Sequence, residues 1–230
     1  MFPREALRFV LLASLAIALT DPMLAPAAQL EWRDAKDWIV SLERPERLAE
    51  LQVEKRLAPL ELKPGDIVAD IGAGTGVFSR AMARAVGPTG RVYAEEIQQA
   101  LVDYIDMRSE QENIDNITTV LGDFDDPKLP TRDVDVAWFH DVLHAVEHKE
   151  SLLKALVSYM KPKSRIAITD WVKSDRNALK YHDDLEILLS RDEVKKLLAA
   201  VGFYPVQDID GYSLSGIKQW YLIFERRAGS

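Results

Sequence analysis

The sequence contains no cysteine among its 230 residues. This absence excludes disulfide bonds, thiolate metal ligands and a cysteine nucleophile. The sequence also lacks a dense cluster of lysine and arginine, and its 37 acidic and 29 basic residues give a formal net charge of −8. Because such a chain repels phosphate groups, we expect no nucleic-acid substrate. The composition, 47% hydrophobic and 29% charged, is typical of a folded globular protein.

The N-terminal segment has an apolar run that is too short for a membrane span. Arg4 and Arg8 precede residues 9–19, a run of about 11 residues, whereas a helix needs roughly 20 to cross a bilayer. Small residues at 25–28 follow as a cleavage site. We therefore predict that residues 1–28 are a signal peptide and that the mature protein is periplasmic or secreted, without stable membrane insertion. The alternative is an uncleaved amphipathic or buried helix, which would leave the protein cytoplasmic or membrane-associated.

Two segments follow this leader. Residues 29–60 have a helical pattern, with Pro45 where helices often begin, and we expect an N-terminal helical cap. Residues 61–230 alternate short β-rich runs with amphipathic helices, which predicts one α/β domain with a mostly parallel sheet. The predicted strands are 67–71, 91–94, 117–121, 134–139 and 165–169, and a helix with Leu152, Leu156 and Met160 on one face precedes the last of them.

The C-terminal part of the sheet is predicted to reverse direction. Ser190 and Glu193 form a capping-box pair that opens a helix. Residues 203–206 and 220–224 follow as strands, separated only by the turn-rich residues 208–218. With no helix between them, the two strands most simply pair as an antiparallel hairpin.

The strongest motif is a glycine-rich loop at the end of the first predicted strand. Gly72, Gly74 and Gly76 follow Asp70, and glycines there allow tight turns and the close approach of a ligand to the main chain. Val77 stands where the dinucleotide fingerprint G-x-G-x-x-G has its third glycine. This departure counts against NAD and FAD.

Two further features follow at the ends of the next strands. Glu95 and Glu96 lie where a carboxylate can accept hydrogen bonds from a ribose diol, and a carboxylate there disfavours NADP. Asp123 and Phe124 offer an acceptor for an exocyclic amine and a ring for a purine to pack against. Each feature alone could be an ordinary loop residue, but their order along one open sheet favours a nucleoside ligand.

With these motifs in place, the chain resembles the class I S-adenosylmethionine-dependent methyltransferases, in particular small-molecule enzymes with a ubiquinone/menaquinone-methyltransferase-like domain. The motifs are DIGAGTG at 70–76, VYAEEI at 92–97, GDFDD at 122–126 and HDVLHAVEH at 140–148, within a resemblance from Leu60 to the C-terminus. The resemblance implies a Rossmann-like seven-stranded sheet of order 3-2-1-4-5-7-6, helices on both faces, an antiparallel C-terminal strand and S-adenosylmethionine as cofactor.

The resemblance also implies where the cofactor binds. Asp70 would place its methionine end, Glu96 rather than Glu95 would bind the ribose, and Asp123 would bind the adenine amine. The full set of implied cofactor-binding residues is Asp70, Gly72, Gly74, Gly76, Glu96, Ile97, Asp123, Phe124 and His140.

Titratable residues after the fourth strand are the candidates for catalysis. His140, Asp141 and His144 lie there, and His140, His144 and His148 would share one face if the segment were helical. Histidines at this spacing could also bind a metal, but no carboxylate or cysteine completes a ligand set, and we predict no metal site. His144 and His148 could equally be packing or solvated residues. His182, in the polar segment before the Ser190 helix, is a further catalytic candidate that would orient the substrate, unless this segment is a solvated loop.

The sequence thus predicts an enzyme that transfers a methyl group from S-adenosylmethionine to a small-molecule acceptor by in-line displacement. A non-catalytic S-adenosylmethionine-binding sensor or scaffold is the first alternative. An NAD-dependent oxidoreductase is the second, and the missing glycine disfavours it.

Overall fold

The computed structural model describes residues 34–180 and 184–227. The predicted signal peptide at 1–28 lies outside these residues, as does the catalytic candidate His182, so both stay predictions. Within the described ranges, no helix is both long and apolar enough to cross a membrane.

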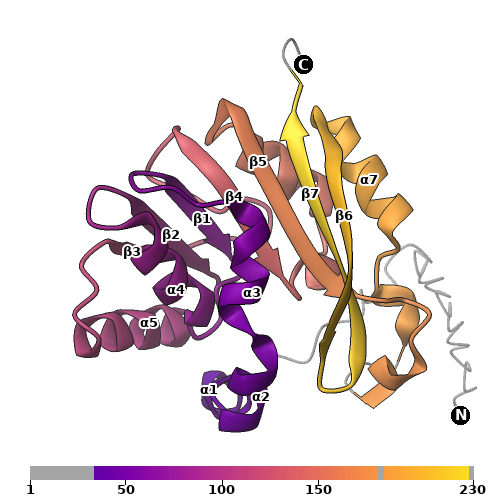
Figure 1. The fold of residues 1–230 in the computed structure, drawn as a ribbon, viewed down its shortest axis with the longest axis horizontal. Helices are drawn as coiled ribbons and strands as arrows, with labels where there is room; N and C mark the ends of the chain where they lie inside the picture. Colours follow the sequence, from indigo (N-terminus) through magenta and orange to yellow (C-terminus); the bar gives the residue numbers. More distant parts are fainter. Residues whose placement is uncertain (1–33, 181–183, 228–230) are drawn as a thin grey trace, which may run out of the picture. The chain divides into compact units, whose positions relative to one another are not determined.

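Seven strands of the described chain form one sheet in the order β3-β2-β1-β4-β5-β7-β6 (Figure 1). Strands β1 to β5 pair in parallel, whereas β7 lies between β5 and β6 and is antiparallel to both. The predicted α/β fold, strand order and antiparallel C-terminal strand are confirmed. The bounds are β1 (Ile67–Ile71), β2 (Arg91–Glu96), β3 (Ile117–Leu121), β4 (Val134–His140), β5 (Met160–Trp171), β6 (Phe203–Leu214) and β7 (Ile217–Arg226).

Helices cover both faces of the sheet. Helices α3 (Val53–Leu57) and α4 (Val77–Val86) pack on one face, and α6 (Lys149–Val157) and α7 (Arg191–Ala200) pack on the other. In the central strand β4, Trp138 packs in the core on the α3 and α4 face. Phe139 packs in the core on the α6 and α7 face, and both side chains are fully buried. The uninterrupted apolar run at 136–139 fits a sheet covered on both sides. The other elements are α5 (Gln99–Gln111), against β2 and β3, and short 3-10 helices at Ala58–Leu60, Leu143–Ala145, Arg176–Lys180 and Leu185–Ile187.

The C-terminal hairpin is longer than predicted. Strands β6 and β7 meet at Ser215 and Gly216, whose φ angles of 53° and 76° suit a two-residue hairpin turn. The prediction that residues 208–218 are turn-rich is therefore wrong. Most of these residues belong to the edge strand β6, whose polar side chains face solvent while Tyr212 and Leu214 are buried. The prediction of Met160 in a helix is also wrong, since α6 ends at Val157 and β5 begins at Met160.

Three short helices lie within the segment predicted to be helical. They are α1 (Ala35–Leu42), α2 (Pro45–Leu51) and α3, and residues 34–60 are called the helical cap below. Arg56 of α3 donates from Nη2 to the Ser213 carbonyl of β6 at 3.0 Å, and the Tyr212 hydroxyl donates to the Lys55 carbonyl at 3.0 Å. These bonds fasten the cap to the hairpin, and α1 and α2 lie beyond the carboxyl ends of the parallel strands (Figure 1).

Candidate functional site

The loop between β1 and α4 requires glycine at three positions. Gly72, Gly74 and Gly76 have φ angles of 67°, 58° and 73°, in the left-handed region that L side chains rarely adopt. A Cβ atom on Gly72 would lie 2.7 Å from the Val142 side chain, and one on Gly74 would lie 3.0 Å from Leu42 of the cap. Conformation and close packing together therefore fix the predicted glycine positions.

Two neighbouring carboxylates of β2 hold this loop. Glu95 Oε2 accepts a hydrogen bond from the Gly72 amide at 3.1 Å, and Glu96 Oε2 accepts one from the Gly74 amide at 3.0 Å. Glu96 Oε1 also accepts from the Ile97 amide at 2.8 Å. The sequence interpretation chose Glu96 over Glu95 for a ligand, whereas the structure gives both carboxylates a role in shaping the loop.

The carboxyl groups around the loop are buried and close together. Burial raises the pKa of Asp70 to about 7, against the hydrogen bond that Ser79 donates to it. Burial also raises the pKa of Glu95 to about 8 and that of Glu96 above its ordinary value. Burial disfavours the charged form of these carboxyl groups, and a nearby positive charge would favour it. The cluster therefore favours a cationic ligand.

The predicted adenine contacts lie just after the carboxyl ends of β2 and β3. Ile97 and Phe124 are apolar side chains with 37% and 51% of their surface exposed, at the ends of β2 and β3. Asp123 accepts from the Phe124 amide at 2.9 Å and pairs with Lys128 at 3.0 Å. The Lys128 hydrogen bond holds the pKa of Asp123 below its ordinary value, so the side chain is a charged acceptor.

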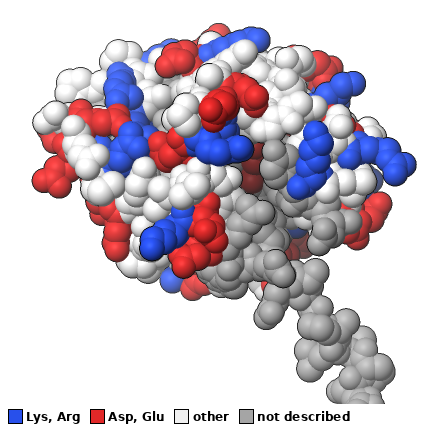
Figure 2. All heavy atoms as spheres, turned by 90° about the horizontal axis from the view of Figure 1, so that it is seen from below, with Lys and Arg blue, Asp and Glu red and all other residues white. Residues whose placement is uncertain are grey.

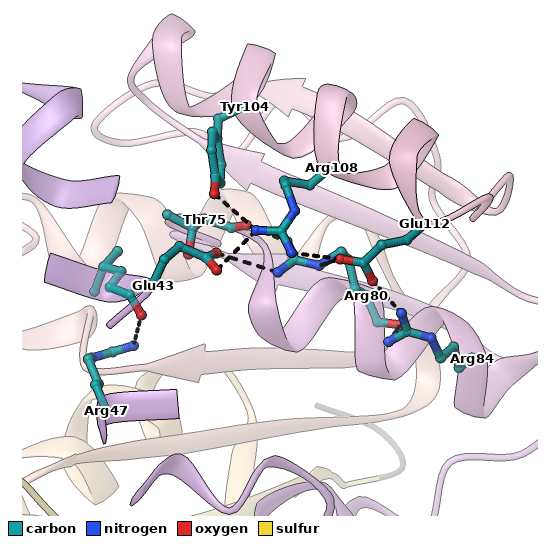
Figure 3. A network of polar contacts seen from close by, with 9 residues as sticks. Glu43, Arg47, Thr75, Arg80, Arg84, Tyr104, Arg108 and Glu112 are labelled. Atoms are coloured by element: carbon teal, nitrogen blue, oxygen red, sulfur yellow. Dashed lines mark hydrogen bonds and ion pairs between the residues drawn. The ribbon is translucent and has the colours of Figure 1, made fainter. Parts of the chain in front are cut away.

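A charge network fastens the cap over the glycine loop (Figure 3). Glu43, just after α1, pairs with Arg80 of α4 at 3.4 Å and with Arg108 of α5 at 3.1 Å. Arg80 Nη1 donates to the Thr75 carbonyl in the loop at 2.6 Å, and both arginines pair with Glu112. Because Arg80 and Glu43 are largely buried, the network places α1 against the loop rather than in solvent.

The histidine motif is not the single helix that would put its three histidines on one face. His140 is the last residue of β4, a short 3-10 helix follows, and α6 begins only at Lys149. Asp141 between them has a φ of 56°, which turns the chain sharply out of the strand. The three histidines therefore do not share one helix face, and exposed His148 stands just before α6.

His144 instead forms a buried pair with Asp170 at the end of β5. The distance between His144 Nδ1 and Asp170 Oδ1 is 2.7 Å, and both side chains are almost fully buried. Asp170 is held by the amides of His144 at 3.2 Å and Trp171 at 2.8 Å. Burial lowers the pKa of His144, but the charge of Asp170 and its hydrogen bond outweigh burial, and the net pKa is raised. Sequence reasoning missed Asp170, whose only signal is an acidic residue closing an apolar strand.

His140 and Asp141 lie beside this pair. The His140 ring stacks on Phe78 at a centroid distance of 4.6 Å, and burial lowers its pKa well below the ordinary value, so the ring is neutral. Burial, with the nearby charge of Asp170, raises the pKa of Asp141 to about 6. Three of the four predicted catalytic residues, His140, Asp141 and His144, are thus together, and His182 lies outside the described residues.

Seen from the carboxyl ends of the strands, acidic and basic side chains are interspersed over the surface (Figure 2). Among the described residues, no group of three or more histidine and acidic side chains is arranged to hold a metal ion. The functional candidates at the carboxyl ends of the strands are instead the buried carboxyl groups around the glycine loop and the His144–Asp170 pair.

Replacing Asp170 by Asn tests the electrostatic account of His144. We expect the pKa of His144 to fall, because burial then acts against the charge of Asp141 alone. An NMR titration of the histidine ring signals measures this pKa. Asp175→Asn is the matched control, since Asp175 also accepts main-chain hydrogen bonds but lies in an exposed turn. An unchanged pKa in Asp170→Asn would contradict the account.

Comparison with known proteins places the chain in a family. A family model described as a methyltransferase domain matches residues 62–224. A ubiquinone/menaquinone biosynthesis C-methyltransferase from Ectopseudomonas mendocina is 30% identical over 113 residues, which cover 49% of this chain and 44% of that protein. The chain thus spans about half the length of the curated relatives it matches.

Solved structures agree with this placement. A S-adenosylmethionine-dependent methyltransferase from Aquifex aeolicus superposes with a TM-score of 0.74 and 25% identity, covering 85% of this chain and all of that one (100%). Geranyl diphosphate C-methyltransferase from Streptomyces coelicolor has a TM-score of 0.65 at 17% identity, with 84% of each chain covered, and at that identity it supports the fold alone. The chain belongs to the methyltransferase-domain family.

Proposed function

We propose that this enzyme transfers the methyl group of S-adenosylmethionine to a small-molecule acceptor by in-line displacement. The observation that carries the proposal is the arrangement of the acid-lined glycine loop and the buried His144–Asp170 pair at one edge of the sheet, next to the helical cap. Ligands of open α/β sheets bind at this edge.

The residues around the loop fit the cofactor. The main chain of Gly72, Gly74 and Gly76 would pass beneath its sugar and methionine, with Asp70 at the methionine end. Glu96 would accept from the ribose hydroxyls, and Asp123 with the exposed faces of Ile97 and Phe124 would receive the adenine. When bound, S-adenosylmethionine supplies a methyl group that is already activated by the positively charged sulfur. The protein therefore has to hold the acceptor in line with it, exclude water and accept a proton.

His144 is suited to accept that proton. Asp170 binds Nδ1, so the imidazole is oriented and Nε2 is the nitrogen that can take a proton from an acceptor. The raised pKa of His144 strengthens it as a base, since Asp170 stabilises the charged ring. Asp141 and neutral His140 lie alongside and shape the acceptor side of the site.

The helical cap favours a small acceptor. Leu42 lies over Gly74, and the Glu43 network keeps α1 there, so the loop is shielded from a bulky polymer. The curated relatives carry the names of small-molecule C-methyltransferases, which supports the same conclusion for this chain. A sensor or scaffold would bind the cofactor without a use for a base, and the buried His144–Asp170 pair disfavours it.

Replacing Glu96 by Ala should weaken S-adenosylmethionine binding about tenfold or more, because a charge-assisted contact of roughly 1.5 kcal/mol is lost. Isothermal titration calorimetry measures the affinity. Glu193→Ala is the matched control, since Glu193 also accepts a main-chain amide, that of Ser190, but lies at α7. If Glu96→Ala binds as tightly as the control, the ribose carboxylate is elsewhere.

Replacing His144 by Ala should lower kcat by about 10² to 10⁴, the usual contribution of a general base, and leave cofactor affinity within about twofold. The acceptor is first found by screening phenols, isoprenoid diphosphates and amines for S-adenosylhomocysteine release. His148→Ala, at the exposed histidine of the same motif, should keep wild-type turnover. Full activity of His144→Ala would rule out His144 as the general base. Binding of the cofactor by the wild type without turnover of any acceptor would favour the sensor.

We also propose that residues 1–28 direct export, on the basis of the charged, apolar and small-residue order of the leader. Sequencing the N-terminus of the protein from fractionated cells tests this. We expect a mature N-terminus near residue 29 outside the cytoplasm, and a retained Met1 in the soluble cytosolic fraction would overturn the proposal.

A further inference from the structure

A set of buried polar atoms near the histidines has no hydrogen-bond partner within the described structure. Buried polar groups are nearly always paired, and an unpaired one costs free energy. A concentration of such atoms at one place, beside a binding site, indicates a ligand rather than a chance packing defect. The atoms are Arg56 Nη1, Trp138 Nε1, His140 Nε2, Thr169 Oγ1, Gln219 Oε1 and Tyr221 Oη.

The strand residues of this set lie on one face of the sheet. His140 is directly opposite Thr169 in the β4–β5 pair, and Thr169 is directly opposite Tyr221 in the β5–β7 pair. Residues opposite each other point to the same face. Trp138 and Gln219 lie two positions along β4 and β7, so their side chains project on that face as well.

Arg56 brings a fixed positive charge to this face from the helical cap. Its side chain is 1% exposed, Nε donates to the Leu51 carbonyl at 2.6 Å, and Nη2 donates to the Ser213 carbonyl. The guanidinium also lies 4.9 Å from the centre of the Tyr212 ring. Three contacts hold the group in place, and its remaining nitrogen, Nη1, has no partner among the described residues.

Within the described structure, no carboxylate pairs with Arg56 Nη1. Its field reaches Tyr221 and His140, and the other charges that act on it are those of Asp141 and Arg47. Asp141 Oδ1 already accepts from Gln219 Nε2 at 2.5 Å. Tyr221 keeps its proton, because burial raises the pKa of the hydroxyl, so Oη can donate.

We propose that Arg56 Nη1, Tyr221 Oη and Thr169 Oγ1 form a subsite for an ionised oxygen of the methyl acceptor. This inference rests on the proposed function, because it places the acceptor beside Phe78 and His140, next to the glycine loop. An oxyanion on these donors is shielded from water, where its attraction to the guanidinium is strong. The ionised oxygen enriches a conjugated carbon of the acceptor in electrons, and this carbon attacks the methyl group. As the new C–C bond forms, the C–S bond breaks and S-adenosylhomocysteine leaves, and the proton lost from the methylated carbon is the one that the proposed base accepts.

The aromatic rings on the same face suggest the probe. The ring of Trp138 lies 5.3 Å from that of Phe78 and 5.4 Å from that of Tyr221. A flat ring bearing one ionisable oxygen would present an apolar face to these rings and an anionic oxygen to the donors. 4-Nitrophenol is such a probe, and its anion is yellow, so its ionisation on the protein can be followed by absorbance. 4-Nitroanisole has the same ring without an ionisable oxygen, and benzoate presents a carboxylate.

The experiment titrates the full-length protein, saturated with S-adenosylhomocysteine, with these compounds. We expect 4-nitrophenol to bind as the yellow anion below the pH at which it ionises free in buffer, releasing its proton to the buffer, and 4-nitroanisole to bind about tenfold more weakly or worse. Displacement of 4-nitrophenol by benzoate would show that the subsite also binds a carboxylate, and failure of benzoate to displace it would restrict the subsite to a phenolate or enolate.

Tyr221→Phe separates binding from folding. It removes a hydroxyl that has no partner within the described structure, so the fold should persist, while 4-nitrophenol affinity should fall about tenfold or more. Ser109→Ala is the matched control, since the Ser109 hydroxyl is also buried and unpaired but lies on α5. Arg56→Lys should weaken the probe as well, and circular dichroism checks its fold.

The inference is overturned if 4-nitrophenol does not bind, binds uncharged, binds no better than 4-nitroanisole, or binds Tyr221→Phe as tightly as Ser109→Ala. Affinity for S-adenosylhomocysteine is measured first and should be equal in the wild type and Tyr221→Phe. A protein that fails to bind S-adenosylhomocysteine contradicts the proposed function itself, which is a different result.

Discussion

The hydrogen bonds from the Gly72 and Gly74 amides to the Glu95 and Glu96 carboxylates are the constraint on which the site depends. They hold Gly72 and Gly74 in the left-handed conformation, which other residue types rarely adopt. They also bury two acidic groups against the loop, where burial raises the pKa of both. One interaction thus shapes the loop and gives it the electrostatic character that a sulfonium ligand requires.

The cap completes the loop from the other side. Glu43 joins α1 to α4 and α5 through Arg80 and Arg108, and Arg80 reaches the Thr75 carbonyl in the loop itself. The same cap carries Arg56 toward β4 and β7. The proposed cofactor and acceptor sides of the site therefore share the helical cap, and the His144–Asp170 pair lies at the carboxyl ends of β4 and β5.

Features that depend on local patterns could be predicted from the sequence. The strand order followed from a resemblance carried by motifs such as the glycine loop, and the capping box of Ser190 and Glu193 forms as expected. The role of Asp170 could not be predicted, because it depends on how a sharp turn at Asp141 brings His144 back to β5. The ion pairs of Glu43 with Arg80 and Arg108 join residues 37 and 65 positions apart, which local patterns do not encode. The long hairpin was missed because an exposed edge strand such as β6 is polar and looks like a loop.

The most direct measurement of the central claim is thermal unfolding of the protein with S-adenosylmethionine, S-adenosylhomocysteine or NAD. A ligand that binds only the folded state stabilises it, by about 2.7 kcal/mol at a hundred times its Kd. The account predicts stabilisation by S-adenosylmethionine and S-adenosylhomocysteine and none by NAD. Stabilisation by NAD alone would contradict it.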